Sequence, residues 1–259
     1  MNSLERSLIL KTGQETGWEN VLEDYAAQIA LASARHPARA TVTFADDRLV
    51  VAFTGEALCG ELMRDFGVNS TDGGRTFTVP YSPNRLTASL ALLSKLLRRA
   101  AELAGALPDQ AVNDFAKAIH DRLETEYVTS TEIERLVRQR VGQDVFREAL
   151  MKYWGGACAV TGVAVPEVLR ASHCKPWAEC ESDSERLDVY NGLLLSANLD
   201  ALFDRGLITF DDAGGIVISS LLPDEARASL RLAEGQCLRW IAAPHSPFLA
   251  YHRAHVYRR

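Results

Sequence analysis

The sequence lacks several features that would assign a protein class at once. No apolar run approaches the roughly 20 residues needed to cross a bilayer, and the first residues show no signal-peptide pattern. Neither the glycine-rich phosphate loop nor the G-x-G-x-x-G turn of nucleotide-binding folds is present. These absences predict a cytoplasmic protein that does not associate with membranes, and they give no support to a nucleotide-binding enzyme.

Cysteine is also scarce. The five cysteines are an odd number without the spacing of a disulfide framework, so reduced thiols are expected. Cys158, Cys174 and Cys180 could form a zinc set with His173. However, the sequence contains no C-x₂-C pair, which is the usual knuckle of a structural zinc site. Structural zinc is therefore the less favoured interpretation.

An excess of positive charge is missing as well, because 28 Lys and Arg are outnumbered by 34 Asp and Glu, a net charge of −6. This balance argues against a protein that coats nucleic acid. It does not exclude a nucleic-acid enzyme, because a local basic patch and a bound metal can both attract phosphate. The local candidates for contacts to DNA phosphates are Lys175, Arg186 and Arg205.

The first 104 residues predict a small α+β domain. Apolar residues at helical spacing predict a helix over residues 18–33. The other predicted elements are strands over 40–44 and 48–54, a helix over 56–66, a strand over 76–79 and a helix over 86–104. Residues 105–109 contain Gly and Pro and are the predicted linker, which divides the chain into domains 1–104 and 105–259.

The second domain is predicted to begin with a helical connector and to continue in the order strand, strand, helix. The predicted helices cover residues 109–124, 131–141 and 143–154, and the predicted strands cover 158–161 and 168–172. A polar loop over 178–188 is followed by a short helix capped by Ser196 and ended by Gly206, and then by a hairpin over 208–218. His252 and His255 are expected on an exposed C-terminal tail. The predicted fold class is α+β.

The chemistry of the sequence is concentrated in the second domain. His173 can take a proton, and Asn191 can orient its ring or hold its backbone. Asp200 and Asp204 stand at i and i+4, so a helix places both carboxylates on one face. Such a pair either repels or shares a cation. A histidine base beside a divalent metal is the minimal equipment for phosphodiester hydrolysis.

These segments resemble the HNH endonucleases, whose core is the ββα-metal finger. The resemblance runs from about residue 135 to the C-terminus and rests on residues 142–150, 156–162, 171–177, 191–196, 202–210 and 251–253. It implies that His173 is the first H and the catalytic base, and that Asn191 is the N. It places Asp200 in the position of the last H, with Asp204 one turn later, and implies that both acids bind the metal.

Two departures from the family pattern bear on the choice of metal. Ser172 precedes the catalytic histidine, where many finger nucleases have a metal ligand, and Asp200 replaces the closing histidine. Oxygen ligands favour Mg²⁺ or Mn²⁺ over a histidine-rich zinc or nickel site.

The resemblance implies a metal-dependent DNA endonuclease of the restriction or phage-defence type, whose N-terminal domain selects a sequence or a modified base. Two alternatives stay open. The N-terminal domain could bind a small ligand or a partner and release a non-specific nuclease. The chain could instead be a catalytically silent DNA-binding module, if Asp200 breaks the site. One finger has one active centre, so a double-strand break requires either a homodimer or two sequential nicks.

Overall fold

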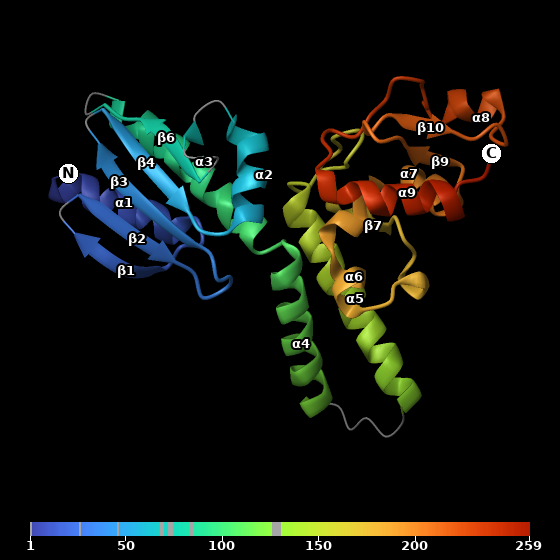
Figure 1. Cartoon of the computed structure of the whole chain (residues 1–259), viewed down its shortest axis with the longest axis horizontal. Helices are drawn as coiled ribbons and strands as arrows, with labels where there is room; N and C mark the ends of the chain where they lie inside the picture. The colour runs from blue at the N-terminus through green and yellow to red at the C-terminus, as the bar shows by residue number, and fades with distance from the viewer. Residues whose placement is uncertain are drawn as a thin grey trace. The chain divides into compact units, whose positions relative to one another are not determined.

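The computed structural model describes residues 2–25, 27–45, 47–67, 70–71, 75–82, 85–125 and 131–259. The chain forms two compact units, Met1–Leu107 and Pro108–Arg259 (Figure 1). Their division lies inside the linker predicted at residues 105–109. No helix among the described residues is long and apolar enough to span a membrane.

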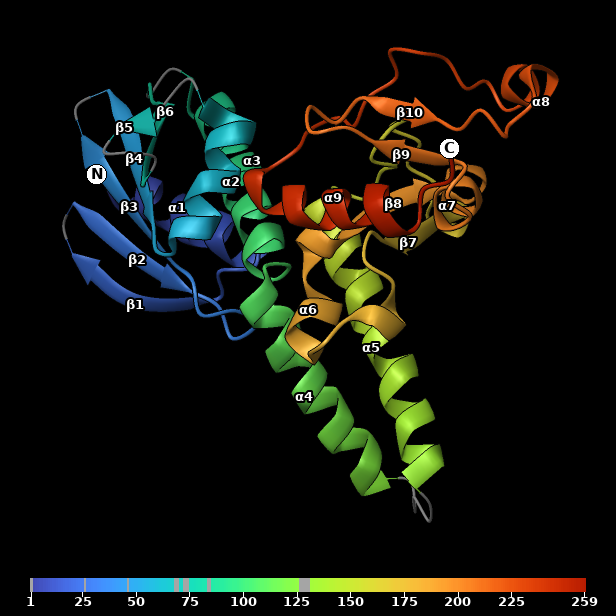
Figure 2. The same ribbon diagram turned by 45° about the vertical axis from the view of Figure 1, so that its right-hand side comes forward.

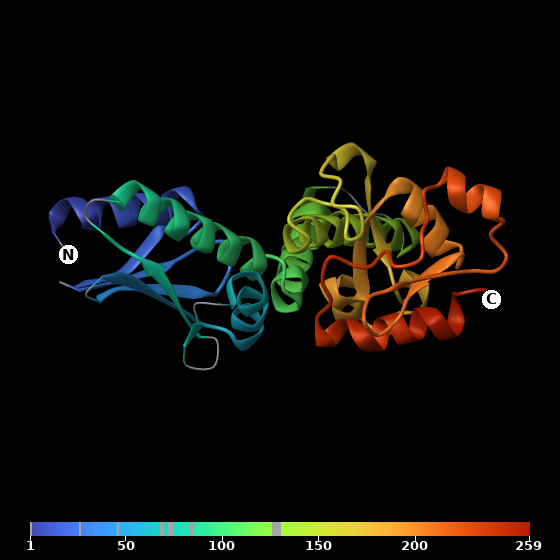
Figure 3. The ribbon, with the colours of Figure 1, turned by 90° about the horizontal axis from the view of Figure 1, so that it is seen from above.

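The first unit is built on a six-stranded sheet in the order β1-β2-β3-β4-β6-β5. Helices α1 and α3 cover one face of this sheet, as the view in Figure 3 shows, and α2 packs against α3. Alternate residues of the strands fill the core between the sheet and these helices; Val42 and Val51, for example, are buried. The elements are α1 (Ser3–Glu15), β1 (Asn20–Tyr25), β2 (Gln28–Ala32), β3 (Arg39–Ala45), β4 (Arg48–Phe53), α2 (Glu56–Phe66), β5 (Ser70–Thr71), β6 (Thr76–Pro80) and α3 (Leu86–Ala104).

The helix predicted over residues 18–33 is wrong, because this segment forms the antiparallel β1–β2 hairpin. Val21, Leu22 and Tyr25 suggested a buried helical face, but their exposed fractions in strand β1 are 50 %, 48 % and 63 %. β1 is an edge strand of the sheet, so these side chains have neighbours on one side only. The residues of this segment that fill the core include Trp18, before β1, and Ile29 and Leu31 on β2.

The helix that opens the chain, α1, was not predicted. Its N-cap is Asn2, whose side chain accepts the N–H of Glu5 while the Glu5 carboxylate accepts the N–H of Asn2. The predictions for β3, β4, α2, β6 and α3 are confirmed.

The second unit begins with two long helices, α4 (Pro108–Thr125) and α5 (Thr131–Tyr153), which pack side by side (Figures 1 and 2). The remaining strands and α-helices are β7 (Leu169–His173), α6 (Asp183–Leu187), β8 (Gly192–Ser196), α7 (Ala197–Asp204), β9 (Ile208–Phe210), β10 (Ile216–Ile218), α8 (Asp224–Ser229) and α9 (Ser246–His255). The 3-10 helices are η4 (Pro166–Val168), η5 (Trp177–Glu179), η6 (Val189–Asn191) and η7 (Ala243–His245). The β9–β10 hairpin confirms the prediction for residues 208–218.

Helix α5 replaces two predicted helices that were to break near Gly142. Gly142 lies inside the continuous helix, where it allows close packing. A Cβ at this position would overlap the Trp177 ring, so the missing side chain lets η5 lie close against the helix.

The first predicted strand of the finger, residues 158–161, is a turn. The Cys158 thiol explains this, because its sulfur accepts the N–H groups of Thr161 and Ser196. The two strands of the finger are instead β7 and β8, which pair antiparallel with His173 opposite Gly192. The observed order is strand, strand, helix in β7, β8 and α7, in which β8 was not predicted as a strand, and the α+β fold class is confirmed.

Candidate active site

His173 is the last residue of β7, and its half-buried ring is held between two aromatic rings. The Phe146 ring from α5 stacks on it, with 3.8 Å between centroids and 14° between planes. The Trp177 ring stands edge-on to it, with centroids 5.7 Å apart. These contacts fix the plane of the imidazole.

The protonation state of His173 follows from its one hydrogen bond to the main chain. Nε2 lies 2.8 Å from the Arg186 carbonyl oxygen, which can only accept, so Nε2 carries the proton and Nδ1 keeps a lone pair. Burial lowers the pKa of His173 to about 4. The ring is therefore neutral near pH 7, and Nδ1 is the atom able to take a proton.

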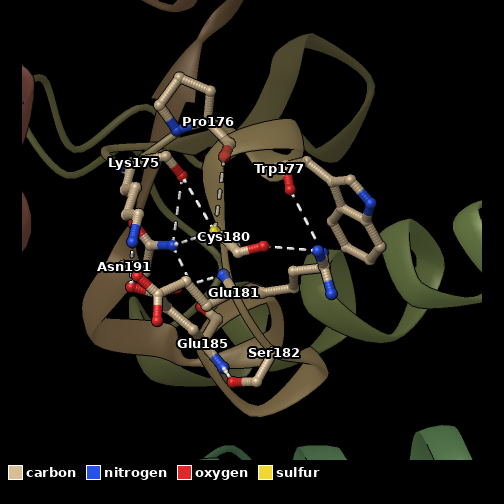
Figure 4. Close-up of polar contacts among 9 residues, drawn as sticks. Lys175, Pro176, Trp177, Cys180, Glu181, Ser182, Glu185 and Asn191 are labelled. Carbon is tan, nitrogen blue, oxygen red and sulfur yellow. Dashed lines mark hydrogen bonds and ion pairs between the residues drawn. The ribbon is translucent and has the colours of Figure 1, made fainter. Parts of the chain in front are cut away.

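Asn191 is fully buried and holds the backbone that follows the histidine (Figure 4). Its Oδ1 accepts the N–H of Lys175 at 2.8 Å, and its Nδ2 lies 3.3 Å from the Lys175 carbonyl and 3.1 Å from that of Glu185. Its own carbonyl accepts the N–H of Cys174 at 2.9 Å. Asn191 thus sets the path of the chain beside His173; none of these contacts reaches the ring.

The Cys180 thiol lies at the centre of the same segment (Figure 4). It lies 3.5 Å and 3.4 Å from the carbonyl oxygens of Lys175 and Pro176, to which it donates, and it accepts from Asn191 Nδ2 at 3.4 Å. Buried main-chain carbonyls of this segment are satisfied in this way, which gives it a fixed conformation.

The three predicted phosphate contacts differ in their surroundings. Arg205 follows α7 and is exposed. Lys175 is 13 % exposed, with Nζ 2.7 Å from Glu185 Oε1 and 5.4 Å from the Tyr251 ring centroid. Arg186 is half-buried and donates to acceptors within its own segment.

Asp200 and Asp204 stand one turn apart on α7. The Ser172 hydroxyl donates to Asp200 Oδ1 at 2.6 Å, which ties the half-buried carboxylate to β7. The pKa of Asp204 is raised to about 6, first by desolvation of the carboxyl group and then by the charge of Asp200. Asp204 is exposed as a whole residue, and the shift reflects desolvation of its carboxyl group.

This donor set fits a hard divalent cation. Mg²⁺ is usually held by one or two protein carboxylates, with water and phosphate oxygens completing its shell. Desolvation and then the charge of Asp200 raise the pKa of Asp204, and a bound cation would relieve the repulsion between the two carboxylates.

No group of three or more His, Cys, Asp and Glu that could hold a metal occurs in the part of the chain that the structure describes. The alternative zinc set of Cys158, Cys174, Cys180 and His173 is therefore not assembled. The Cys158 sulfur is occupied by main-chain N–H groups, and the Cys174 side chain is fully buried.

The surroundings of two aromatic side chains, Phe146 and His252, were not predicted. Phe146 carried no sign of its position, because stacking on His173 depends on how α5 packs against β7. His252 was expected on an exposed tail but is buried. Its Nδ1 lies 2.9 Å from Thr209 Oγ1, and its Nε2 lies 3.1 Å from the carbonyl of Phe203, whose ring it stacks on at 3.7 Å.

The comparison with protein families agrees with this geometry. Residues 158–211 match a family model described as HNH endonuclease. The match contains β7, β8 and α7, and with them all four predicted catalytic and metal-binding residues, and it lies wholly within the second unit. No curated protein matches the chain.

Proposed function

We propose that the HNH endonuclease domain in the second unit makes this chain a metal-dependent DNA endonuclease. The observation that carries the proposal is the state of His173. His173, the proposed base, lies at the end of β7 inside the matched segment; its ring is neutral, and the Arg186 carbonyl binds Nε2 rather than Nδ1. A base of this kind is what attack by water on phosphorus requires.

In the proposed reaction, His173 Nδ1 takes a proton from a water molecule, and the water oxygen bonds to phosphorus as the bond to the 3′ oxygen breaks. Asn191 keeps the histidine backbone in place. Asp200 and Asp204 would hold Mg²⁺ or Mn²⁺, which when bound stabilises the charge on the phosphate and the leaving oxygen. Lys175 and Arg205 are the proposed contacts to neighbouring phosphates.

For the first unit we propose target selection, by sequence or by a modified base, in a restriction or phage-defence role. The support is modular: the unit is compact, and none of the proposed chemistry lies in it. A unit that senses a small ligand or a partner and releases a non-specific nuclease is the second candidate. A homodimer would supply the two active centres that a double-strand break needs.

A plasmid assay tests the activity. The full chain should nick or linearise supercoiled DNA with Mg²⁺ or Mn²⁺, and EDTA should stop it. His173→Ala should lower the rate by about 10² to 10⁴, which is the usual contribution of a general base. His255→Ala is the matched control, because His255 is an exposed histidine of the same unit. Intact plasmid under every metal condition would favour the silent DNA-binding module.

Sequencing of the fragment ends separates the two roles of the first unit. A target-selecting enzyme leaves recurring sequences or modified bases at its cut sites. A released non-specific nuclease leaves ends without a recurring sequence.

A further inference from the structure

Arg186 uses all three nitrogens of its side chain inside the protein. Nε donates to the Trp177 carbonyl at 3.2 Å, Nη2 to the Cys180 carbonyl at 2.5 Å, and Nη1 to Asp183 Oδ1 at 3.0 Å. These acceptors span η5 and the start of α6. The guanidinium therefore closes residues 177–186 into a compact loop.

The main chain of the same residue contacts the catalytic ring. The Arg186 N–H donates to the Ser182 carbonyl at 3.1 Å, and the Arg186 carbonyl accepts from His173 Nε2 at 2.8 Å. The position of this carbonyl is thus set by a residue whose own side chain is held at several points. A shift of the loop would move the acceptor away from Nε2.

A second connection runs through Trp177. The Arg186 guanidinium carbon lies 5.8 Å from the centre of the Trp177 ring, and this ring stands edge-on to His173 at 5.7 Å. The Trp177 ring also lies against Gly142 of α5. The guanidinium thus supports both the acceptor of His173 and one of its aromatic neighbours.

We propose that Arg186 is a positioning residue for His173. Its guanidinium holds the loop so that the Arg186 carbonyl keeps Nε2 protonated and leaves Nδ1 as the base. The inference rests on the proposed role of His173 as the base. It assigns Arg186 an internal task in place of the phosphate contact expected from the sequence.

The geometry requires arginine at this position. The acceptors at Trp177, Cys180 and Asp183 are met by three different nitrogens of one planar group. A lysine ammonium is a single point charge and does not reproduce this fork. Arg186→Lys should therefore fail to restore the arrangement.

The test measures the tautomer of the His173 ring. The full chain, labelled with ¹⁵N-histidine, is examined by NMR without DNA or metal, and His173→Gln identifies the His173 signals. The wild type should show the Nε2–H tautomer, and Arg186→Met should add a measurable Nδ1–H population. Arg170→Met is the matched control and should match the wild type. Arg170 also donates to main-chain carbonyls, of Glu167 and Leu169, but at the far end of β7.

Kinetics and DNA binding provide a second readout. A positioning residue predicts a fall in kcat of about 10- to 100-fold, typical for groups that orient a catalytic side chain, with KM and the salt dependence of DNA binding unchanged. A phosphate contact predicts instead that the salt slope falls by about 1. A reduced slope with an unchanged tautomer would overturn the proposal.

Asp183→Asn covers the case in which Arg186→Met does not fold, because it weakens one of the three contacts at a partly exposed side chain. It should shift the tautomer in the same direction by a smaller amount. A folded variant with an unchanged ring refutes the proposal. Because the tautomer is read without DNA, a shifted ring in a protein that cuts nothing refutes only the nuclease function.

Discussion

At the scale of single residues, His173 and Asp204 have opposite pKa shifts within one β7–β8–α7 motif. Burial lowers the pKa of the histidine to about 4, whereas desolvation and the charge of Asp200 raise the pKa of Asp204 to about 6. Above about pH 6 the His173 ring is therefore neutral while the Asp204 carboxyl group is mostly ionised. Both groups are then in the state that metal-dependent hydrolysis requires.

The acid pair leads to a prediction about stability and metal. The folded chain holds the Asp204 proton more tightly than the unfolded chain, whose ordinary value is 3.8. This contribution to the stability of the metal-free protein is present below pH 3.8 and is lost as the pH rises through about 6. Asp204→Asn should therefore raise the Tm of metal-free protein at pH 7 and have little effect at pH 4.

The same variant should weaken metal binding. Calorimetry should show weaker Mn²⁺ binding for Asp200→Asn and for Asp204→Asn, with non-additive effects in the double variant, because both acids bear on one cation. Mn²⁺ should raise the Tm of the wild type but not that of the double variant. Unchanged Mn²⁺ affinity in the double variant would remove these acids from the metal site.

The sequence indicates which residues are candidates for the chemistry, but it does not show which side chains and main-chain atoms hold one another in place. His173 and Asn191 were selected by their side-chain chemistry and by the family resemblance, and Asp200 and Asp204 also by their i, i+4 spacing. The internal role of Arg186 was not accessible, because two of its acceptors are main-chain carbonyls, which every residue possesses. Asn191 illustrates the same limit, since its partners are also largely main-chain atoms.

At the scale of elements, the close packing of α5 against the β7–β8 strand pair depends on Gly192. This glycine pairs with His173, and a Cβ there would overlap the Phe146 ring and lie 2.9 Å from Leu150 Cδ1. Gly192→Ala should destabilise the protein by about 1–3 kcal/mol through overpacking. Because Phe146 stacks on the ring of the proposed base His173, cleavage should fall further than the loss of folded protein explains.

Urea unfolding and plasmid cleavage, measured on the same preparations, check this prediction. Gly60→Ala in α2 is the control, because nothing lies within 4 Å of a Cβ there. It should stabilise the helix by up to about 1 kcal/mol and leave cleavage unchanged. Normal cleavage by a stable Gly192→Ala protein would show that the Phe146 stack is dispensable.

Helix α9 is joined to β9 and α7 by His252, and this contact should make the unit sensitive to acid. Burial lowers the pKa of His252 to about 4, so the folded chain binds its proton less tightly than the unfolded chain. Its contribution to stability is present above pH 6.5 and is lost as the pH falls through about 4. The Tm should drop across this window.

His252→Gln should reduce stability at pH 7 and flatten the dependence on acid, because the amide cannot become charged. Thermal unfolding between pH 7 and pH 4 measures both effects. His255→Gln, at an exposed position of the same helix, should follow the wild-type curve. If the Tm of His252→Gln and of the wild type fell in parallel between pH 7 and pH 4, His252 would not be the cause of the acid sensitivity.

Elements were predictable where periodicity and burial agree. Helix α3 and strand β4 bury the residues that their patterns indicate. The helix prediction for the β1 segment was wrong because its apolar residues are exposed on an edge strand. Their spacing therefore carried no information about the core. Helix α5 was divided in error because a glycine that admits Trp177 looks the same in sequence as one that ends a helix.

At the scale of the whole molecule, a fragment of residues 108–259 should fold alone and cut DNA, because it contains every proposed catalytic group and forms a compact unit. Loss of a target-selecting unit should leave weak cleavage that falls steeply with salt, since only phosphate contacts remain. Loss of an inhibitory sensor should raise basal cleavage above that of the full chain. Circular dichroism and plasmid assays distinguish these results. An unfolded fragment would show that the units depend on each other.

The place of the division was accessible from Gly105 and Pro108, which end one helix and begin the next. The function of the first unit could not be predicted from the sequence. A binding surface is made by side chains from several strands and has no characteristic spacing.

The division between the units has an evolutionary consequence. Each unit is one uninterrupted stretch of sequence, and the chain passes between them once, after Leu107. One crossover in the coding DNA at this point would attach the second unit to a different first unit without interrupting α3 or α4. Recombination could therefore exchange the first unit while the segment that matches the HNH endonuclease family is passed on intact.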